Sequence, residues 1–82
     1  MKNDQIIKNF VEGATIGKNT TGNLFISGNN LINYSTVIAK RKNNKIYLNI
    51  NHYSQTTSKI QNMIRKSINV IEITESQIKN IA

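Results

Sequence analysis

Two adjacent asparagines, Asn43 and Asn44, separate two stretches of the chain that both have the composition of β-strands. Asparagine tolerates the positive φ angles of a two-residue turn, so this dipeptide predicts a tight hairpin. Before the turn, residues 31–41 are rich in β-branched and aromatic residues and predict one long strand, with Tyr34 on its core side. After the turn, apolar and polar residues alternate. The core face of this second strand carries Ile46, Leu48 and Ile50.

The other elements follow from apolar spacing and from capping residues. They are a helix over 5–12 capped by Asp4, a loop over 14–22 with a strand start near Thr15-Ile16, a strand over 24–26, a helix capped by Ser54 or Ser58, a strand over 70–73 and a closing helix from Thr74. The predicted order is α-β-β-β-α-β-α. We therefore expect one domain over residues 1–82, of the α+β class, with a small three- to four-stranded antiparallel sheet and helices packed on one face.

The composition limits the chemistry open to the chain. It has no cysteine and one histidine, so neither a disulfide nor a zinc site of the usual ligands is expected, and no cofactor or metal is predicted. No apolar run is long enough to cross a bilayer, and residues 1–5 do not lead into a secretory signal. We expect a cytoplasmic protein with no membrane partner.

Positive charge is the most prominent compositional feature. Eleven Lys and Arg residues against four acidic residues give a formal net charge of +7. Such a field attracts polyanions, nucleic acid first, then acidic proteins and anionic lipid. The alternative is that part of the charge has no function. Asn, Ile and Lys are all frequent here, as they are in proteins from AT-rich genomes, whose codons favour these residues.

Two basic segments and one aromatic residue are candidates for binding. The hairpin contributes Lys40, Arg41, Lys42 and Lys45, and the following helix contributes Lys59, Arg65 and Lys66. Tyr47 lies opposite the core face beside the basic turn, where its ring can stack on a base. Each candidate has an alternative explanation. The hairpin lysines can serve to keep a sheet edge soluble, and the sheet face that carries Tyr47 can form a homodimer contact.

Residues for catalysis are few. His52 stands alone between a strand and a helix, and Glu72 and Glu75 are separated by a strand-to-helix turn, so no acid–base pair is indicated. The chain has no nucleotide-binding loop and no nucleophile elbow. We therefore expect a binding protein and not an enzyme.

Three sequence blocks carry a resemblance to a known group of proteins. They are Asn33 to Ala39 (NYSTVIA), Leu48-Asn49, and Tyr53 to Gln61 (YSQTTSKIQ). Together they resemble a family of small uncharacterised proteins encoded by bacteriophages and prophages, over about residues 24–68. Members of that family often have His where this chain has Ile60, so a role for a polar group at that position does not carry over.

The resemblance implies a phage or mobile-element origin. Small phage proteins of this kind commonly act by stoichiometric binding, so the first expectation is an inhibitor of a host defence complex, such as a CRISPR effector. The alternative is a nucleic-acid-binding protein of phage replication or gene regulation. The hydroxyl-rich segment from Tyr53 to Lys59 also has a structural explanation, because hydroxyl groups at a helix start satisfy its free amides.

Overall fold

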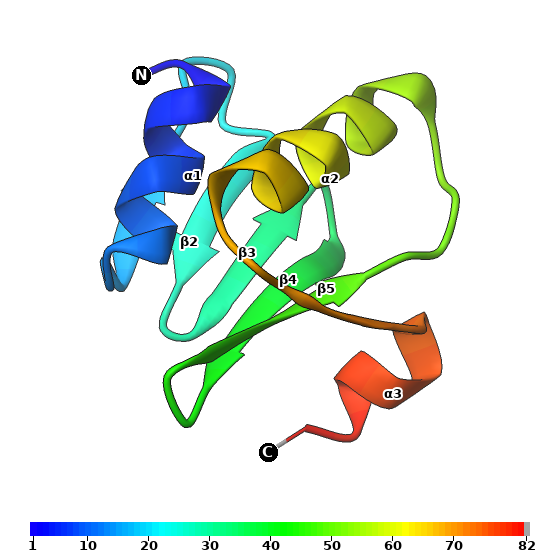
Figure 1. Cartoon of the computed structure of the whole chain (residues 1–82). Helices are drawn as coiled ribbons and strands as arrows, with labels where there is room; N and C mark the ends of the chain where they lie inside the picture. Colours follow the sequence, from blue (N-terminus) through cyan, green and yellow to red (C-terminus); the bar gives the residue numbers. More distant parts are fainter. Residues whose placement is uncertain (82) are drawn as a thin grey trace.

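The sheet contains the hairpin that the two asparagines predict. In a computed structural model that describes residues 1–81, Asn43 and Asn44 have φ angles of 54° and 63°. They connect β4 (Thr36–Lys42) to β5 (Lys45–Asn49), as Figure 1 shows. Two successive positive φ angles match the twist of the flanking strands, so the hairpin prediction is confirmed.

Six strands form one mixed sheet within residues 1–81, in the order β1-β2-β3-β4-β5-β6. The other four strands are β1 (Ile16–Lys18), β2 (Leu24–Ser27), β3 (Asn30–Asn33) and β6 (Ile71–Ile73). Neighbours run antiparallel from β1 to β5, whereas β6 is parallel to β5. Parallel neighbours need a crossover connection, and α2 (Gln55–Ser67) supplies it.

The α+β class is confirmed, but the predicted sheet of three to four antiparallel strands is wrong. The predicted order α-β-β-β-α-β-α lacks two strands. One is β1, which lies in the segment predicted as a loop and begins where a strand start near Thr15-Ile16 is indicated. The other arises because residues 31–41 fold as two strands: Tyr34, with a φ of 57°, starts a turn between β3 and β4. Tyr34 is 58% exposed, so its predicted core position is also wrong.

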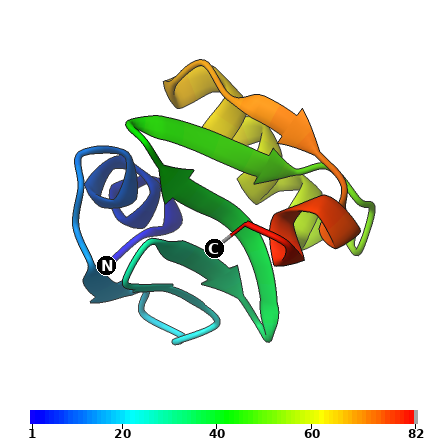
Figure 2. The same cartoon turned by 90° about the horizontal axis from the view of Figure 1, so that it is seen from below.

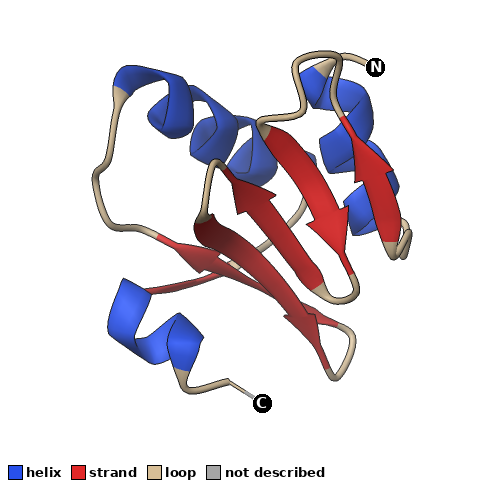
Figure 3. Cartoon of the chain, turned by 180° about the vertical axis from the view of Figure 1, so that it is seen from behind, coloured by secondary structure: helices blue, strands red, loops and turns tan. Residues whose placement is uncertain are grey.

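The helices lie on both faces of the sheet, and the prediction that they share one face is wrong. Figures 1 and 3 show α1 (Asn3–Val11) and α2 together on one face, with α3 (Glu75–Lys79) on the other. The second face is partly apolar near Val37, and α3 packs there on β4 and β5 with Ile78 buried. Short closing helices can cover either face, because the capping residues that start them carry no information about side.

The core fills the space between the sheet and the helix pair. A β-bulge adds one residue to it: Val37 pairs with Ile32 and Ala39 with Leu31, so Ile38 is the extra residue, and both Ile38 and Ala39 are fully buried. The core comprises Ile6, Ile7, Phe10, Leu24, Ile26, Leu31, Ile38, Ala39, Ile46, Leu48, Ile60 and Ile64. Ile50, predicted for the core, follows the end of β5 and is 41% exposed.

The helix starts agree with the predicted caps in two cases of three. Ser54 caps α2, since its Oγ accepts a hydrogen bond from the Thr57 amide at 3.2 Å. Thr74 caps α3 in a reciprocal capping box with Gln77. The first helix begins at Asn3 and not at residue 5, so Asp4 lies in its first turn and does not cap it.

Candidate functional site

Little of the positive charge is neutralised by carboxylates. Among residues 1–81, the ion pairs join Arg65 to Glu72 at 3.4 Å and Lys79 to Glu75 at 3.5 Å. The two other acidic residues, Asp4 and Glu12, are exposed on or beside α1 and form no ion pair with the described cations. Nine of the eleven cationic side chains are therefore free of a described carboxylate partner.

The β4–β5 hairpin divides its cations between the two faces of the sheet. Side chains alternate along a strand, and Ala39 and Leu48 are buried beneath the helix pair. Arg41 therefore points toward α1, whereas Lys40 and Lys42 point to the face that carries α3. The register places Tyr47 opposite Lys40 and Lys45 opposite Lys42, so all four of these side chains start from the α3 side.

Arg41 is engaged in the fold. Its guanidinium donates hydrogen bonds to the carbonyl oxygens of Phe10, at 2.6 Å, and Gly28, at 2.7 Å. It also lies 4.6 Å from the centre of the Phe10 ring, a cation–π contact. Burial lowers the pKa of this side chain from its ordinary value. Arg41 thus joins α1 to the turn between β2 and β3, and this use leaves few of its donors for a partner.

Lys40 lies near the chain's last described residues, and Tyr47 is its partner on β5. The Lys40 Nζ donates a hydrogen bond to the Ile81 carbonyl oxygen at 2.7 Å, because the segment after α3 runs across this face of the sheet, as Figure 2 shows from below. Tyr47 is partly exposed and has Ile71 as its partner on β6. Its ring therefore lies beside Lys40 on the face opposite the core, as the alternation in the sequence predicts.

The first two strands add a lysine and an aromatic ring to the same face. Lys18 pairs with Phe25 across β1 and β2, and Phe25 pairs with Ile32. Because Leu24 and Ile26 are buried beneath the helices, Phe25 and its partner Lys18 must point the other way. The sequence identified neither residue as a binding candidate. Lys18 falls in the segment predicted as a loop, and Phe25 falls in the predicted strand over 24–26, a continuous apolar run with no alternation to mark its outer face.

We define the lysine face as the sheet face opposite α1 and α2. Its lysines are Lys18, Lys40, Lys42 and Lys45. The only described carboxylate on this side is that of Glu75, which is already bound to Tyr53 and Lys79. Glu72 lies on the helix side, since it shares the face of Leu48 and pairs with Arg65 of α2.

Two hollows border this surface. One, of about 430 Å³, lies beside Phe25 and is lined by Ile16, Gly17, Lys18, Gly22, Phe25 and Ile26. The other, of about 480 Å³, lies on the helix side between the hairpin tip and the end of α1, and its lining includes Glu12, Arg41, Lys42 and Lys45. The second hollow therefore has mixed charge, whereas the first is apolar with a lysine at its edge.

The three predicted cations of α2 lie apart from the hairpin lysines. Lys59, Arg65 and Lys66 are exposed on the helix that covers the opposite sheet face. Arg65 is held by Glu72 and by the Asn62 Oδ1 at 2.8 Å, and Lys59 borders a groove with Lys2. The structure thus brings together Lys40, Lys42, Lys45 and Tyr47 of the predicted set and separates the other four residues from them.

Residues of the three sequence blocks NYSTVIA, Leu48-Asn49 and YSQTTSKIQ form a largely buried polar network. The Asn33 Oδ1 accepts a hydrogen bond from the Thr57 Oγ1 at 2.7 Å. The Gln61 Nε2 donates to the Asn49 carbonyl oxygen at 2.6 Å, and the Asn49 Nδ2 donates to the Tyr53 Oη at 2.8 Å. These contacts join the ends of β3 and β5 to the start of α2. They give the blocks a structural role, because buried polar groups need such partners.

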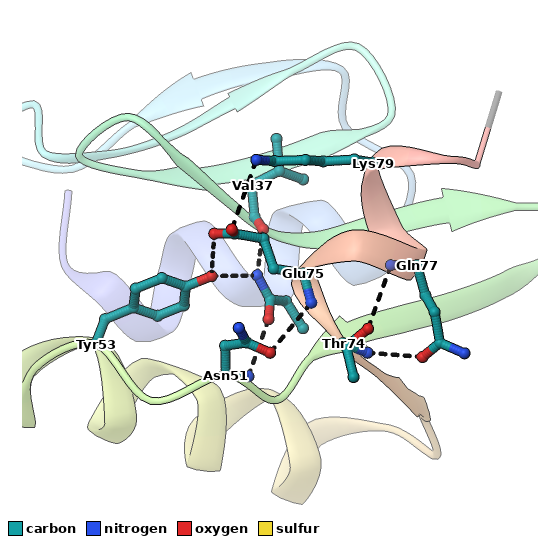
Figure 4. A network of polar contacts seen from close by, with 8 residues as sticks. Val37, Asn51, Tyr53, Thr74, Glu75, Gln77 and Lys79 are labelled. Atoms are coloured by element: carbon teal, nitrogen blue, oxygen red, sulfur yellow. Dashed lines mark hydrogen bonds and ion pairs between the residues drawn. The ribbon is translucent and has the colours of Figure 1, made fainter.

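The network continues to α3, as Figure 4 shows. The Tyr53 Oη donates to Glu75 Oε2 at 2.6 Å, and the Glu75 amide donates to Asn51 Oδ1 at 3.1 Å. Ile60, in the third of these blocks, is 1% exposed within the core. His52 is exposed and lies 3.5 Å from the Ser58 Oγ.

Within residues 1–81, no three acidic or histidine side chains come together as metal ligands do. None of the described helices combines the length and apolar character that crossing a membrane requires. No protein-family model matches the chain, and neither the curated proteins nor the solved structures contain a significant match to it.

Proposed function

We propose that this chain is a binding protein whose lysine face contacts the phosphate backbone of a nucleic acid. The observation that carries the proposal is the grouping of Lys18, Lys40, Lys42 and Lys45 on one sheet face, where the only described carboxylate already has two partners. Lys40 also donates to the Ile81 carbonyl oxygen, whereas the other three make no side-chain hydrogen bond within residues 1–81. Lysines on an exposed face reach phosphates while their ammonium groups stay hydrated.

The electrostatics favour a polyanion over a small anion. The lysines are spread along three strands and are not gathered around one enclosed pocket. A linear array of phosphates can meet such a spread at several points, and each contact releases a bound counterion. A net charge of +7 adds long-range attraction to the encounter.

The resemblance to phage and prophage proteins supports a bacterial cytoplasmic setting. In that setting, the nucleic acid is either free, as in phage replication or gene regulation, or is the RNA of a host defence complex that the protein inhibits. The lysine face needs no protein partner to contact phosphates, so we propose binding to free nucleic acid before inhibition of a defence complex. The resemblance alone favours the second.

The test compares two double charge reversals. Lys42→Glu/Lys45→Glu changes the lysine face, and Lys59→Glu/Lys66→Glu changes exposed lysines of α2. Each pair of reversals removes four units of charge, from +7 to +3, so the two variants are matched in net charge. Affinity for a labelled single-stranded oligonucleotide is measured by fluorescence anisotropy over a salt series.

We expect the hairpin variant to lose most of its affinity and the α2 variant to retain more. If about four phosphates are contacted, the wild-type slope of log K against log salt is about −3, and it halves in the hairpin variant. Equal losses in both variants would show that net charge alone is responsible. No binding by the wild type would refute direct contact, and a guide-RNA effector complex is then the second target to test with the same variants.

A further inference from the structure

We infer that the lysine face takes single-stranded nucleic acid in preference to duplex, and that the hollow beside Phe25 holds a nucleobase. This inference rests on the proposed function and specifies its ligand. It goes beyond charge, because it assigns a role to two aromatic rings and to an apolar hollow that phosphate binding alone does not need.

Each partly exposed ring of the lysine face stands next to a lysine on the neighbouring strand. Phe25 is the direct partner of Lys18, and Tyr47 is the direct partner of Lys40. Side chains of such cross-strand partners start about 5 Å apart on the same face. A base stacked on the ring therefore leaves its phosphate within reach of the adjacent lysine.

The hollow beside Phe25 is shaped by its neighbours. Ile16 is 84% exposed at the edge of the sheet, and Lys18 stands at the rim. An ideal Cβ on Gly17 would lie 3.6 Å from Ile26 and 3.7 Å from Ile6, so this residue faces the core and adds no side chain to the hollow. The volume, about 430 Å³, lies within the usual range for small organic ligands, about 300–1000 Å³.

The positive charge around this hollow indicates which kind of ligand it binds. An apolar site edged by lysine, on a face with no free described carboxylate, suits a flat ring that carries a phosphate. A second copy of the chain is disfavoured here, because it brings the same positive face and the same net charge. Bases in a duplex are stacked on one another and cannot enter, whereas bases of a single strand are free to do so.

The chain offers an internal control for testing this site. It has two phenylalanines, of which Phe10 is fully buried in the core and Phe25 lies on the lysine face. Incorporation of fluorophenylalanine gives two ¹⁹F resonances, assigned with a Phe25→Leu variant. Oligodeoxythymidine and a DNA duplex are added separately to the full chain, and affinities are measured in parallel by anisotropy.

The expected result is a shift of the Phe25 resonance with the single strand and no shift of Phe10. Phe25→Leu should weaken single-strand binding about tenfold and change duplex binding little. Equal affinity for both nucleic acids with an unmoved Phe25 resonance overturns the inference and leaves the proposed function intact. If the wild-type chain binds neither nucleic acid, both the inference and the proposed function are refuted. A Phe25 shift that depends on protein concentration without nucleic acid shows that a second copy covers the hollow, which also overturns the inference.

Discussion

The Tyr53 Oη donates a hydrogen bond of 2.6 Å to Glu75 Oε2, a residue 22 positions later in the chain. This bond connects the loop before α2 to the first turn of α3, and the Asn49 Nδ2 donates to the same Tyr53 oxygen at 2.8 Å (Figure 4). The short closing helix is thereby attached to the polar network that holds the ends of β3 and β5. Its docking should depend on the protonation of both partners.

The pH dependence of this contact follows from two shifted groups. The hydrogen bond from Tyr53, and then the charge of Lys79, lower the pKa of Glu75 from its ordinary 4.5. A pKa lowered by folding means that the stabilisation is complete above about pH 4.5 and is lost as pH falls through the folded-state value. Burial first, and then the bond to Glu75, raise the pKa of Tyr53 above 10.0, so its contribution is lost only as pH rises through that higher value.

Replacing Tyr53 with Phe should raise the pKa of Glu75 toward 4.5, because the largest cause of its lowering is removed. The measurement is a carboxyl ¹³C NMR titration of both proteins. Tyr34→Phe is the matched control, since the Tyr34 hydroxyl makes none of the hydrogen bonds found within residues 1–81 and the Glu75 titration should not move. An unchanged Glu75 pKa in Tyr53→Phe would contradict the assigned contact.

Gln61 should be among the most sensitive polar positions of the chain. It is 4% exposed, and its Nε2 donates to the carbonyl oxygens of Asn49 and Asn51 at 2.6 and 3.1 Å. Gln61→Met keeps the volume and removes both donors, so we expect a loss of about 2–4 kcal/mol in the free energy of unfolding. Gln55→Met, at an exposed position of the same helix, should change it by about 0.5 kcal/mol or less. Urea denaturation of both variants tests the difference.

Much of the local structure could be predicted from short segments of the sequence. The Asn43-Asn44 hairpin, the Ser54 cap of α2 and the capping box at Thr74 each depend on side chains within a few residues of the backbone they satisfy. Local chemistry of this kind does not need the rest of the fold. The same holds for the face of Tyr47, which follows from alternation along a single strand.

The errors arose where tertiary packing decides. The run of β-branched and aromatic residues over 31–41 gives no sign of a break at Tyr34, because a tyrosine rarely adopts a positive φ. The strand β1 has three residues and is stabilised by its pairing with β2. Because β1 was not predicted, the sheet face of Lys18 could not be assigned. The hydrogen bond of Arg41 to α1 depends on where that helix packs, so the sequence did not distinguish Arg41 from the neighbouring lysines as a structural residue.

The Tyr34 backbone should be a source of strain that substitution can relieve. Its φ of 57° disfavours a bulky side chain, and its own side chain is 58% exposed and so contributes little burial. Tyr34→Asn should raise the free energy of unfolding by about 0.5–1 kcal/mol, since asparagine tolerates this conformation. Tyr34→Ala, which removes the ring but keeps the strain, is the control and should not stabilise. A loss of stability in Tyr34→Asn would show that the ring makes contacts that outweigh the strain.

Among the hairpin cations, Arg41 should matter more for stability and Lys42 more for binding. Its guanidinium bonds two carbonyl oxygens and contacts the Phe10 ring, so Arg41→Gln should lower the free energy of unfolding by about 1–3 kcal/mol. Lys42→Gln removes the same charge from a side chain on the lysine face and should leave stability within about 0.5 kcal/mol. Oligonucleotide affinity should show the opposite order, with the larger loss in Lys42→Gln. If Arg41→Gln weakens binding more than Lys42→Gln at a temperature where both variants are folded, the partner approaches from the α1 side, and the assignment of the lysine face is wrong.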